Sequence, residues 1–286
     1  MFYEARAKEG DVRGLLSLAP HEAKRLIAKA VARIPEVKRA LSDGWVIIAN
    51  GTTNAFIAEE ILGIKIDRSN YTIGCIAEGE ITANISPDRM RPFILKKGEP
   101  QDMYLEEGLR EMGKGDVFIK GASAVDPYGK AGVLLAGDGG GTIGRALPFI
   151  ISRDIELIVP VGLEKLIPSV EEASRRTGIF YFKYSFGIPS HLFVFPNPKV
   201  ITEIQAFAIL FGVKATLIGG GGIAGSEGST IFSIEGDEEA VRRAFELVRE
   251  IKDEPPLKSP PKIFKKSREL SMDALKILEE FRSRRW

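Results

Sequence analysis

Trp45-Val46-Ile47-Ile48-Ala49-Asn50-Gly51-Thr52-Thr53-Asn54 decides the fold of this chain, because an apolar strand ends here in a turn of small polar residues. A helical pattern from Ala55 to Leu62 follows directly. The first backbone N–H groups of an α-helix have no partner within the helix and lie at the positive end of its dipole. Such a turn is therefore typical of a pocket for phosphate or carboxylate. Thr52, Thr53 and Asn54 are equally good N-caps, so the turn alone leaves both interpretations open.

The segments around this stretch alternate between strand and helix. Three further apolar runs predict strands, at residues 117–119, 131–136 and 155–161. Helical patterns accompany them, at residues 21–41 with a break or bend at Pro35, 103–112 and 163–176. Strands that are apolar throughout are buried on both faces. We therefore predict that residues 1–185 form an α/β domain with a Rossmann-like, mostly parallel sheet and helices on both faces.

The pattern changes after residue 185. Strand and helix signals alternate at shorter intervals, at residues 192–195, 200–211, 213–218, 230–234 and 237–252. This order predicts a smaller α+β domain, residues 186–254, with a ferredoxin-like arrangement. Residues 255–286 are predicted to form a Pro-rich linker and a last helix. Ser271 is the expected cap of that helix, whose apolar stripe contains Met272, Leu275, Leu278 and Phe281.

Composition limits the class of protein. The chain has 286 residues, 44% of them apolar and 28% charged, which fits about two globular domains. Its 40 basic and 39 acidic side chains nearly cancel, which argues against nucleic acid as a partner. Cys75 is the only cysteine and there are two histidines, so we expect no disulfide framework, no metal and no cofactor. Residues 1–11 lack the apolar core of a signal peptide, and no apolar run reaches the roughly 20 residues of a membrane span. We therefore expect a cytoplasmic protein with no membrane partner.

A glycine-rich loop at residues 137–144 lies between a predicted strand and a helix. Its backbone can approach a ligand closely, and its N–H groups can bind an anion. The residues that we expect to contact a ligand are Gly139, Gly140, Gly141, Thr142 and Arg145. The loop matches G-x-G-x-x-G, with Glu164 after the next strand, but Pro148 interrupts the helix that would carry a pyrophosphate. We therefore set dinucleotide binding aside, and the loop remains either an anion site or a flexible connection.

The turn at Gly51, the pair Lys120-Gly121 and the loop at Gly139 all follow predicted strands. Ligands of open parallel sheets bind at the carboxyl ends of the strands, so we expect these three segments to converge. Lys120 is then placed to neutralise a phosphate, although a lysine at a strand end can also be simply solvated.

These residues carry a resemblance. Residues 50–54 entering a helix, with Lys120-Gly121-Ala122 and the loop at residues 137–144, resemble the superfamily of ribose-5-phosphate isomerase, glucosamine-6-phosphate deaminases, CoA transferases and the sugar-sensing domains of DeoR-type repressors. The likeness covers roughly residues 20–178 and concerns the fold and the phosphate loop. It implies that Gly51, Thr52, Thr53 and Asn54 hold a phosphate or an acyl-CoA group.

The chain departs from that superfamily at the catalytic positions. The pentose-phosphate isomerases carry Asp-Gly-Ala-Asp-Glu where this chain has Lys120-Gly121-Ala122-Ser123-Ala124, which offers no base. Asp126 and Asp138 are the carboxylates that can replace it, although aspartates in turns are more often turn formers. Glu227, in the glycine-rich segment 219–229, resembles the glutamate-containing loop of CoA transferases, and a mobile hairpin is the alternative. Through residues 212–218 and 234–241, the second domain resembles ferredoxin-like modules, including those of microcompartment shell proteins, which implies assembly into a homo-oligomer.

The sequence thus favours a protein that binds a phosphorylated or otherwise anionic small metabolite at the Gly51 turn. Whether it is an enzyme stays open, and an isomerase acting on a sugar phosphate is favoured over a transferase. In that hypothesis Asp126 or Asp138 transfers the proton. The alternatives are a CoA-transferase-like enzyme and a noncatalytic metabolite sensor or assembly protein.

Overall fold

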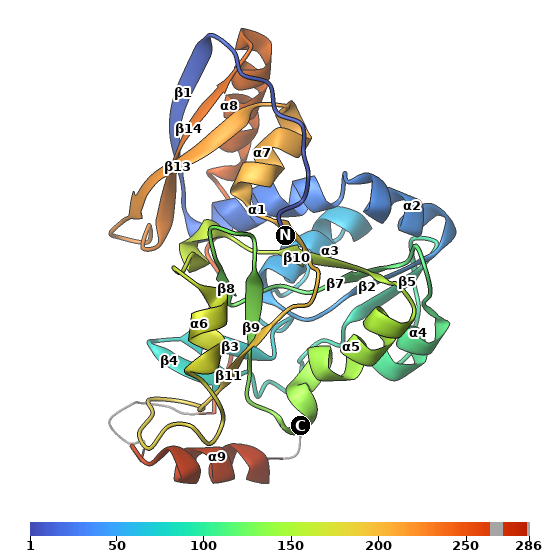
Figure 1. Ribbon diagram of the computed structural model, residues 1–286, viewed down its shortest axis with the longest axis vertical. Helices are drawn as coiled ribbons and strands as arrows, with labels where there is room; N and C mark the ends of the chain where they lie inside the picture. Colours follow the sequence, from blue (N-terminus) through green and yellow to red (C-terminus); the bar gives the residue numbers. More distant parts are fainter. Residues whose placement is uncertain (264–270, 285–286) are drawn as a thin grey trace.

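The computed structural model describes residues 1–263 and 271–284, and its centre is a mixed sheet of six strands (Figure 1). Four neighbouring strands pair in parallel, the fifth strand is antiparallel to them, and the sixth pairs antiparallel with the fifth. Their spatial order is β12 (Lys199–Ile201), β10 (Glu156–Pro160), β7 (Val117–Ile119), β2 (Trp45–Ile48), β5 (Phe93–Lys96) and β6 (Glu99–Pro100). The prediction of an α/β fold is confirmed at this coarse level, and the central sheet is mixed.

The central strands are buried because they carry apolar residues on both faces. Val46, Ile47 and Ile48 of β2 and the whole of β7 have no solvent exposure. The predicted strands at residues 45–48 and 117–119 lie where their patterns place them. Strands β5, β6 and β12 are short and did not stand out in the sequence.

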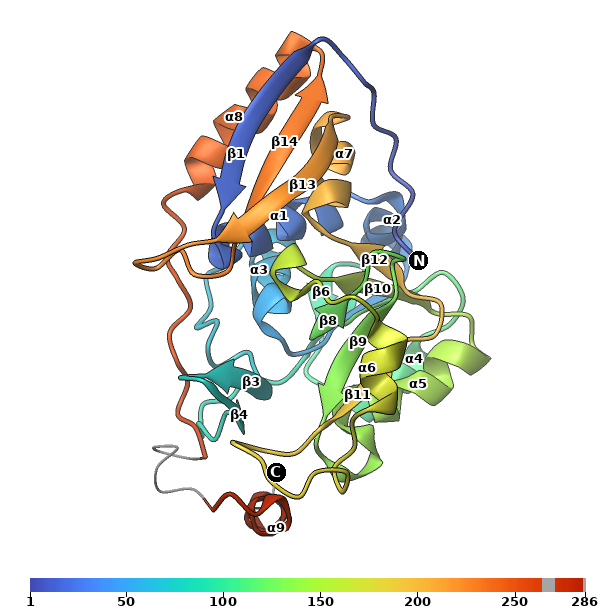
Figure 2. The same cartoon turned by 60° about the vertical axis from the view of Figure 1, so that its left-hand side comes forward.

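Helices lie on both sides of this sheet (Figures 1 and 2). On one side are α1 (Pro20–Val31), α2 (Pro35–Asp43) and α3 (Thr52–Leu62), and on the other are α4 (Leu105–Glu111) and α5 (Gly141–Ser152). Pro35 is the first residue of α2, which confirms that it splits the helical pattern at residues 21–41.

The expected interruption at Pro148 is wrong, because α5 continues through this residue. Pro148 is exposed, and Gly144, whose carbonyl group loses its donor at this proline, is only half-buried.

A second sheet has three antiparallel strands in the order β1 (Val12–Leu18), β14 (Ser229–Gly236) and β13 (Lys214–Gly221). Helices α7 (Glu203–Phe211) and α8 (Glu238–Ile251) lie on one side of it (Figure 2). Strand β1 was not predicted, and it pairs with β14 along its whole length instead of belonging to the first domain. A ferredoxin-like unit has four strands and this sheet has three, so that assignment is not confirmed.

Smaller elements complete the structure. Strand β11 (His191–Val194) pairs with β9 (Ala131–Leu135), which also pairs with β8 (Ala124–Val125). Strand β12 also joins the six-stranded sheet. Residues 191–201, which we predicted to lie in the second domain, therefore pair with strands of the predicted first domain. The remaining elements are the hairpin β3 (Gly74–Ala77) and β4 (Glu80–Ala83), the short helices η1 (Asp138–Gly140) and η2 (Leu163–Lys165), and α6 (Val170–Arg175).

The last helix, α9 (Ala274–Ser283), packs on its own chain. Ile277, Leu278 and Phe281 are buried in one small cluster with Ile188. The predicted stripe is only partly correct, because Met272 and Leu275 are more than half exposed. The cap is also different, since the side chain of Asp273 accepts the hydrogen bond from the backbone N–H of Leu275.

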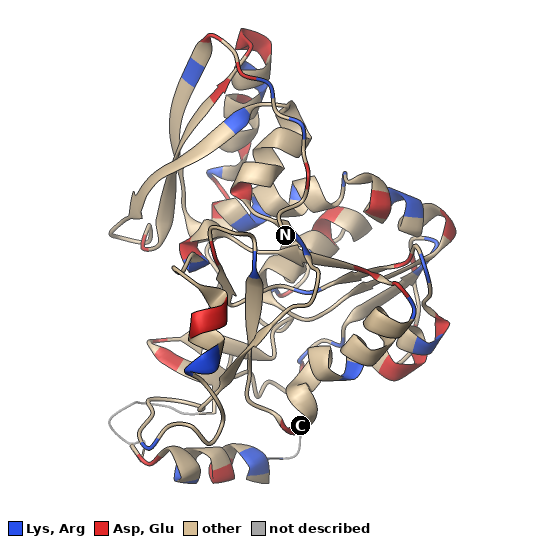
Figure 3. Cartoon of the chain, viewed as in Figure 1, with Lys and Arg blue, Asp and Glu red and all other residues tan. Residues whose placement is uncertain are grey.

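Charges of both signs are interspersed on the helices, for example along α2 and α9 (Figure 3). This distribution agrees with the near balance of 40 basic and 39 acidic residues. Within residues 1–263 and 271–284, no helix is both long and apolar enough to cross a bilayer.

Candidate functional site

The four parallel strands present polar residues at one edge of the sheet. Because β2, β7, β10 and β12 run in the same direction, their carboxyl ends meet at this edge. The residues that follow the strands are Asn50-Gly51, Lys120-Gly121, Gly162 to Lys165 and Thr202-Glu203. We call this group, together with the start of α3 and Lys24 of α1, the strand-end site.

The start of α3 is the first part of this site. Gly51 is the N-cap, and no side chain caps the helix. Thr52, Thr53 and Asn54 are therefore the first three helical residues, and the alternative that they act as N-caps is wrong. In the described part of the chain, their backbone N–H groups have no hydrogen-bond partner. Gly51 and Thr52 are half-buried, so a small anion can reach this end of the helix.

Asn54 is fully buried, and its side chain has a fixed orientation. Its Nδ2 atom donates to two backbone carbonyl oxygens, those of Ala49 at 2.6 Å and Ile119 at 3.2 Å. Its Oδ1 atom has no partner among the described residues. A Cβ atom added to Gly121 would lie 3.7 Å from this oxygen. The free acceptor of Asn54 therefore faces the loop that follows β7.

Glu164 is the centre of the charged part of the site. Its Oε1 atom lies 2.9 Å from Nζ of Lys24 and 3.9 Å from Nζ of Lys165. Burial would raise the pKa of Glu164, but these two ammonium groups outweigh it, so the pKa lies below its usual value. The other carboxylate oxygen, Oε2, is buried and has no partner among the residues that the structure describes.

Two glycines leave room for this carboxylate. A Cβ atom on Gly162 would lie 1.8 Å from Oε2 of Glu164, so any other residue at this position would require the carboxylate of Glu164 to move. Gly228, in the turn between β13 and β14, also approaches the site, because a Cβ there would lie 3.9 Å from Cβ of Glu164. The hairpin of the small sheet therefore reaches the edge of the large one.

Two further groups have shifted pKa values. Glu203 is fully buried and accepts the N–H of Leu163 with both carboxylate oxygens, at 3.1 and 2.9 Å. Burial and the charge of Glu164 raise its pKa to about 8. Burial and the charge of Lys165 lower the pKa of Lys120 to about 8. Neighbouring titratable groups with pKa values shifted in this way are typical of acid–base sites, although structural ion pairs produce shifts as well.

Lys120 differs from the other two lysines of the site. Lys24 Nζ donates to Pro20 O and Glu164, and Lys165 Nζ donates to Ala122 O at 3.1 Å. For Lys120, which is half-buried, no hydrogen bond or ion pair of Nζ occurs within residues 1–263 and 271–284. Its ammonium group is therefore available to a ligand.

The two aspartates proposed as catalytic groups have other roles. The buried carboxylate of Asp126 accepts the backbone N–H groups of Tyr128, Lys130 and Val170, as a turn former does. Asp138 forms an ion pair with Arg282 of α9 at the protein surface. Neither aspartate follows one of the four parallel strands of the large sheet.

The glycine-rich loop is not part of the strand-end site. It follows β9, which belongs to the sheet of β8, β9 and β11, and it forms η1 and the first turn of α5. Gly139, Gly140 and Gly141 have φ values of +72°, +74° and +58°, so glycine is favoured there by the backbone itself. Thr142 is buried in α5, and Arg145 pairs with Glu106 at 2.7 Å. The expected convergence therefore holds for Gly51 and Lys120 and is wrong for this loop.

Sequence reasoning missed Lys24, Lys165 and Glu203, and it considered Glu164 only for a dinucleotide. For Glu164 and Lys165 a usable signal was present, because both lie in the segment that directly follows the predicted strand at residues 155–161. Lys120 follows a predicted strand in the same way. Lys24 and Glu203 lie in or at the start of helices, and no sequence pattern links them to this edge.

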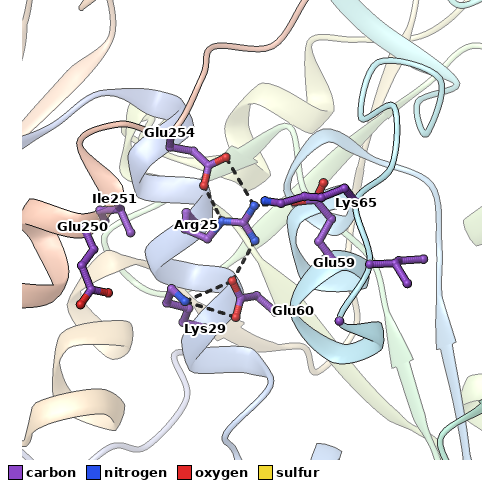
Figure 4. A pocket seen from close by; sticks show the side chains of 10 residues that line it. Arg25, Lys29, Glu59, Glu60, Lys65, Glu250, Ile251 and Glu254 are labelled. Carbon is purple, nitrogen blue, oxygen red and sulfur yellow. Dashed lines mark hydrogen bonds and ion pairs between the residues drawn. The ribbon is translucent and has the colours of Figure 1, made fainter.

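An open depression of ≈ 410 Å³ lies elsewhere, between α1, α3 and the end of α8 (Figure 4). Its centre is Arg25, which contacts Glu59, Glu60 and Glu254 at 2.5 to 2.8 Å. Lys29 pairs with Glu60, and Arg68 pairs with Glu59 and Glu254, so three cations balance three carboxylates. We therefore interpret the depression as an ion-pair network that joins the elements.

Other candidate chemistry is sparse. Within the described residues, no group of three or more His, Cys, Asp or Glu side chains is arranged to hold a metal. Cys75 is half-buried, and burial raises the pKa of its thiol, which lowers its reactivity. Glu227 accepts a hydrogen bond from the N–H of Gly225 within its own exposed turn.

No family model, curated protein or solved structure matches this chain.

Proposed function

We propose that the protein binds a small phosphorylated or otherwise anionic metabolite that also carries hydroxyl groups, at the strand-end site. The observation that carries this proposal is a set of polar groups without partners among the described residues. The donors are the first N–H groups of α3 and the ammonium group of Lys120. The acceptors are Oδ1 of Asn54 and Oε2 of Glu164.

The chemistry of these groups defines the ligand class. Unpaired N–H groups at a helix N-terminus and a nearby ammonium group favour an anion. Buried acceptor oxygens without partners are costly, and a hydroxyl group can satisfy them. A sugar phosphate offers both kinds of group, whereas inorganic phosphate offers only the first.

We further propose a proton-transfer reaction of the sugar-phosphate isomerase type. Glu164 takes the role of base, because its carboxylate is ionised and has one free oxygen in the site. This assignment replaces Asp126 and Asp138. Glu203 holds the loop at residue 163 in place and acts through Glu164. The remaining alternative, a metabolite sensor, uses the same binding groups without turnover.

The finer description of the fold is also a proposal. The parallel strands β2, β7, β10 and β12 follow one another across the sheet in chain order, which fits a Rossmann-like half with the Gly51 turn after its first strand. Such a unit supports the proposed likeness to the sugar-phosphate isomerase superfamily. A cytoplasmic location and self-association remain parts of the same proposal.

Calorimetric titration tests the binding. Ribose 5-phosphate is compared with ribose, and Lys120→Met is compared with Lys114→Met, since Lys114 and Lys120 flank β7 at opposite ends. Removing a charge-assisted hydrogen bond of about 1.5–3 kcal/mol should weaken the affinity of Lys120→Met for ribose 5-phosphate about tenfold or more. Lys114→Met should bind normally. Equal affinities of both variants would refute the site.

Turnover separates an enzyme from a sensor. An isomerase should convert ribose 5-phosphate or another aldose phosphate to the ketose, and Glu164→Gln should lower kcat by about 100-fold or more because it lacks the base. Binding by the wild-type protein without conversion of any tested sugar phosphate would favour the sensor.

A further inference from the structure

We infer that the Nζ atom of Lys120 is a nucleophile that forms an imine with an aldehyde or ketone group of the bound metabolite. The inference rests on the proposed function and narrows the ligand to a phosphorylated carbonyl compound. In its charged form Lys120 helps to attract the anion, and in its neutral form it attacks the carbonyl group while the phosphate stays with the N–H groups of α3.

The first argument is the choice among three lysines. The ammonium groups of Lys24 and Lys165 each donate to a backbone carbonyl oxygen and lie within 4 Å of Glu164, so attack on a carbonyl would break these contacts. Lys120 has no such contact within the described residues. Its amine can therefore react without the loss of an ion pair.

The second argument is protonation. Only a neutral amine attacks a carbonyl, and an ordinary lysine is almost fully protonated at neutral pH. Burial and the neighbouring Lys165 lower the pKa of Lys120 to about 8, and Lys165 has its own contacts that hold it near. A substantial neutral fraction then exists at mildly alkaline pH.

The third argument is position. Lys120 directly follows the central strand β7, between the turn of α3 after β2 and the loop of Glu164 after β10. A ligand held at the start of α3 presents its other end along this edge toward Lys120 and Glu164.

The proposed step balances as an amine condensation. The lone pair of Nζ forms a C–N bond with the carbonyl carbon, and the carbonyl oxygen takes a proton to become a hydroxyl group. That proton comes from the attacking nitrogen, and a second proton from solvent water lets the hydroxyl leave as water, which gives a C=NH⁺ iminium ion. The iminium accepts the electron pair that is left when a base removes a proton from the adjacent carbon, and the carboxylate of Glu164 is the group available to take that proton.

Reductive trapping tests the inference. The wild-type protein is incubated with D-glyceraldehyde 3-phosphate and sodium cyanoborohydride, and the modified lysines are located by peptide mass spectrometry. Glyceraldehyde is the matched probe without phosphate, and glycerol 3-phosphate is the matched anion without a carbonyl. We expect modification mainly at Lys120, at least about tenfold less with glyceraldehyde, and protection by added glycerol 3-phosphate.

The peptide map of the wild-type protein decides the outcome, so the test does not depend on the folding of a variant. Lys120→Arg adds a second measurement, because arginine retains the charge but forms no imine: it should bind glycerol 3-phosphate and lose the trapped product. If glycerol 3-phosphate binds but the label is absent, scattered or on another lysine, the imine is refuted and the anion site stands. If neither phosphate binds, both proposals are wrong.

Discussion

The carboxylate of Glu164 and the ammonium group of Lys24 lie 2.9 Å apart although 140 positions of the chain separate them. Their side chains are only 13% and 7% exposed. Lys24 belongs to α1, which directly follows the first strand of the small sheet, whereas Glu164 follows a strand of the large sheet. This ion pair therefore joins the two sheets at the strand-end site.

Lys24→Met should destabilise the protein, because it leaves a buried carboxylate without its nearest cation. Loss of one partner of a buried pair costs about 3–5 kcal/mol in unfolding free energy, and Lys165 should keep the loss near the lower end. Lys29→Met in the same helix is the control, since its pair with Glu60 is longer at 3.3 Å and more exposed, and about 1 kcal/mol or less is expected. Urea denaturation of both variants measures the difference. Similar losses would show that the buried pair has no special role.

Gly121→Ala should weaken ligand binding and leave stability nearly unchanged. The added Cβ would lie 3.7 Å from Oδ1 of Asn54 and 3.8 Å from the carbonyl oxygen of Pro160, which are ordinary contact distances. The methyl group would then occupy the space beside the free acceptor, and the affinity for ribose 5-phosphate should fall about tenfold, as expected for loss of one hydrogen bond of about 1.4 kcal/mol. Calorimetry gives the affinity, and thermal denaturation gives the stability. Unchanged affinity would place the ligand away from Asn54.

The sequence predicts elements whose cause is local and fails where pairing over long distances decides. The strand at Trp45, the split at Pro35 and the strand before Lys120 follow from apolar runs and from proline geometry. Strand β1 pairs with residues more than 200 positions away, and its sequence Val-Arg-Gly-Leu-Leu-Ser-Leu does not alternate strictly between apolar and polar residues. The residues of the strand-end site also fall into a group that the sequence predicts and a group that it does not. The Gly51 turn and Lys120 follow recognisable strands, but only the folded chain brings Lys24 and Glu203 to Glu164.

The pH dependence of the unfolding free energy should reveal the raised pKa of Glu203. Its pKa is about 8 in the folded protein and near 4.5 in the unfolded chain, so folding favours the protonated form. Its stabilising contribution is complete below about pH 4.5 and is lost as the pH rises toward about 8, with a slope of at most about 1.4 kcal/mol per pH unit. Glu203→Gln removes this pH-dependent contribution, because glutamine does not ionise. The stability of the wild-type protein relative to this variant should therefore fall between about pH 5 and pH 8.

The contribution of Glu164 to stability changes with pH in the opposite direction to that of Glu203, and it changes in a different pH range. Its folded pKa is lowered, so its contribution is present above about pH 4.5 and is lost only below it. Measurements of urea denaturation between about pH 5 and pH 8 therefore isolate Glu203 from Glu164. A constant difference between the wild-type protein and Glu203→Gln across this range would contradict the raised pKa.

Asp126→Ala should lower stability without any effect on ligand affinity. The carboxylate of Asp126 is 1% exposed and accepts three backbone N–H groups, so its removal leaves these donors without a partner at a cost of about 3 kcal/mol. Asp138→Ala is the matched control, because its side chain is 70% exposed and its loss should change stability by about 0.5 kcal/mol or less. Urea denaturation and titration with ribose 5-phosphate distinguish a turn former from a site residue. If Asp126→Ala retained full stability but lost turnover or binding, the proton transfer would belong to Asp126, and our assignment of Glu164 would be wrong.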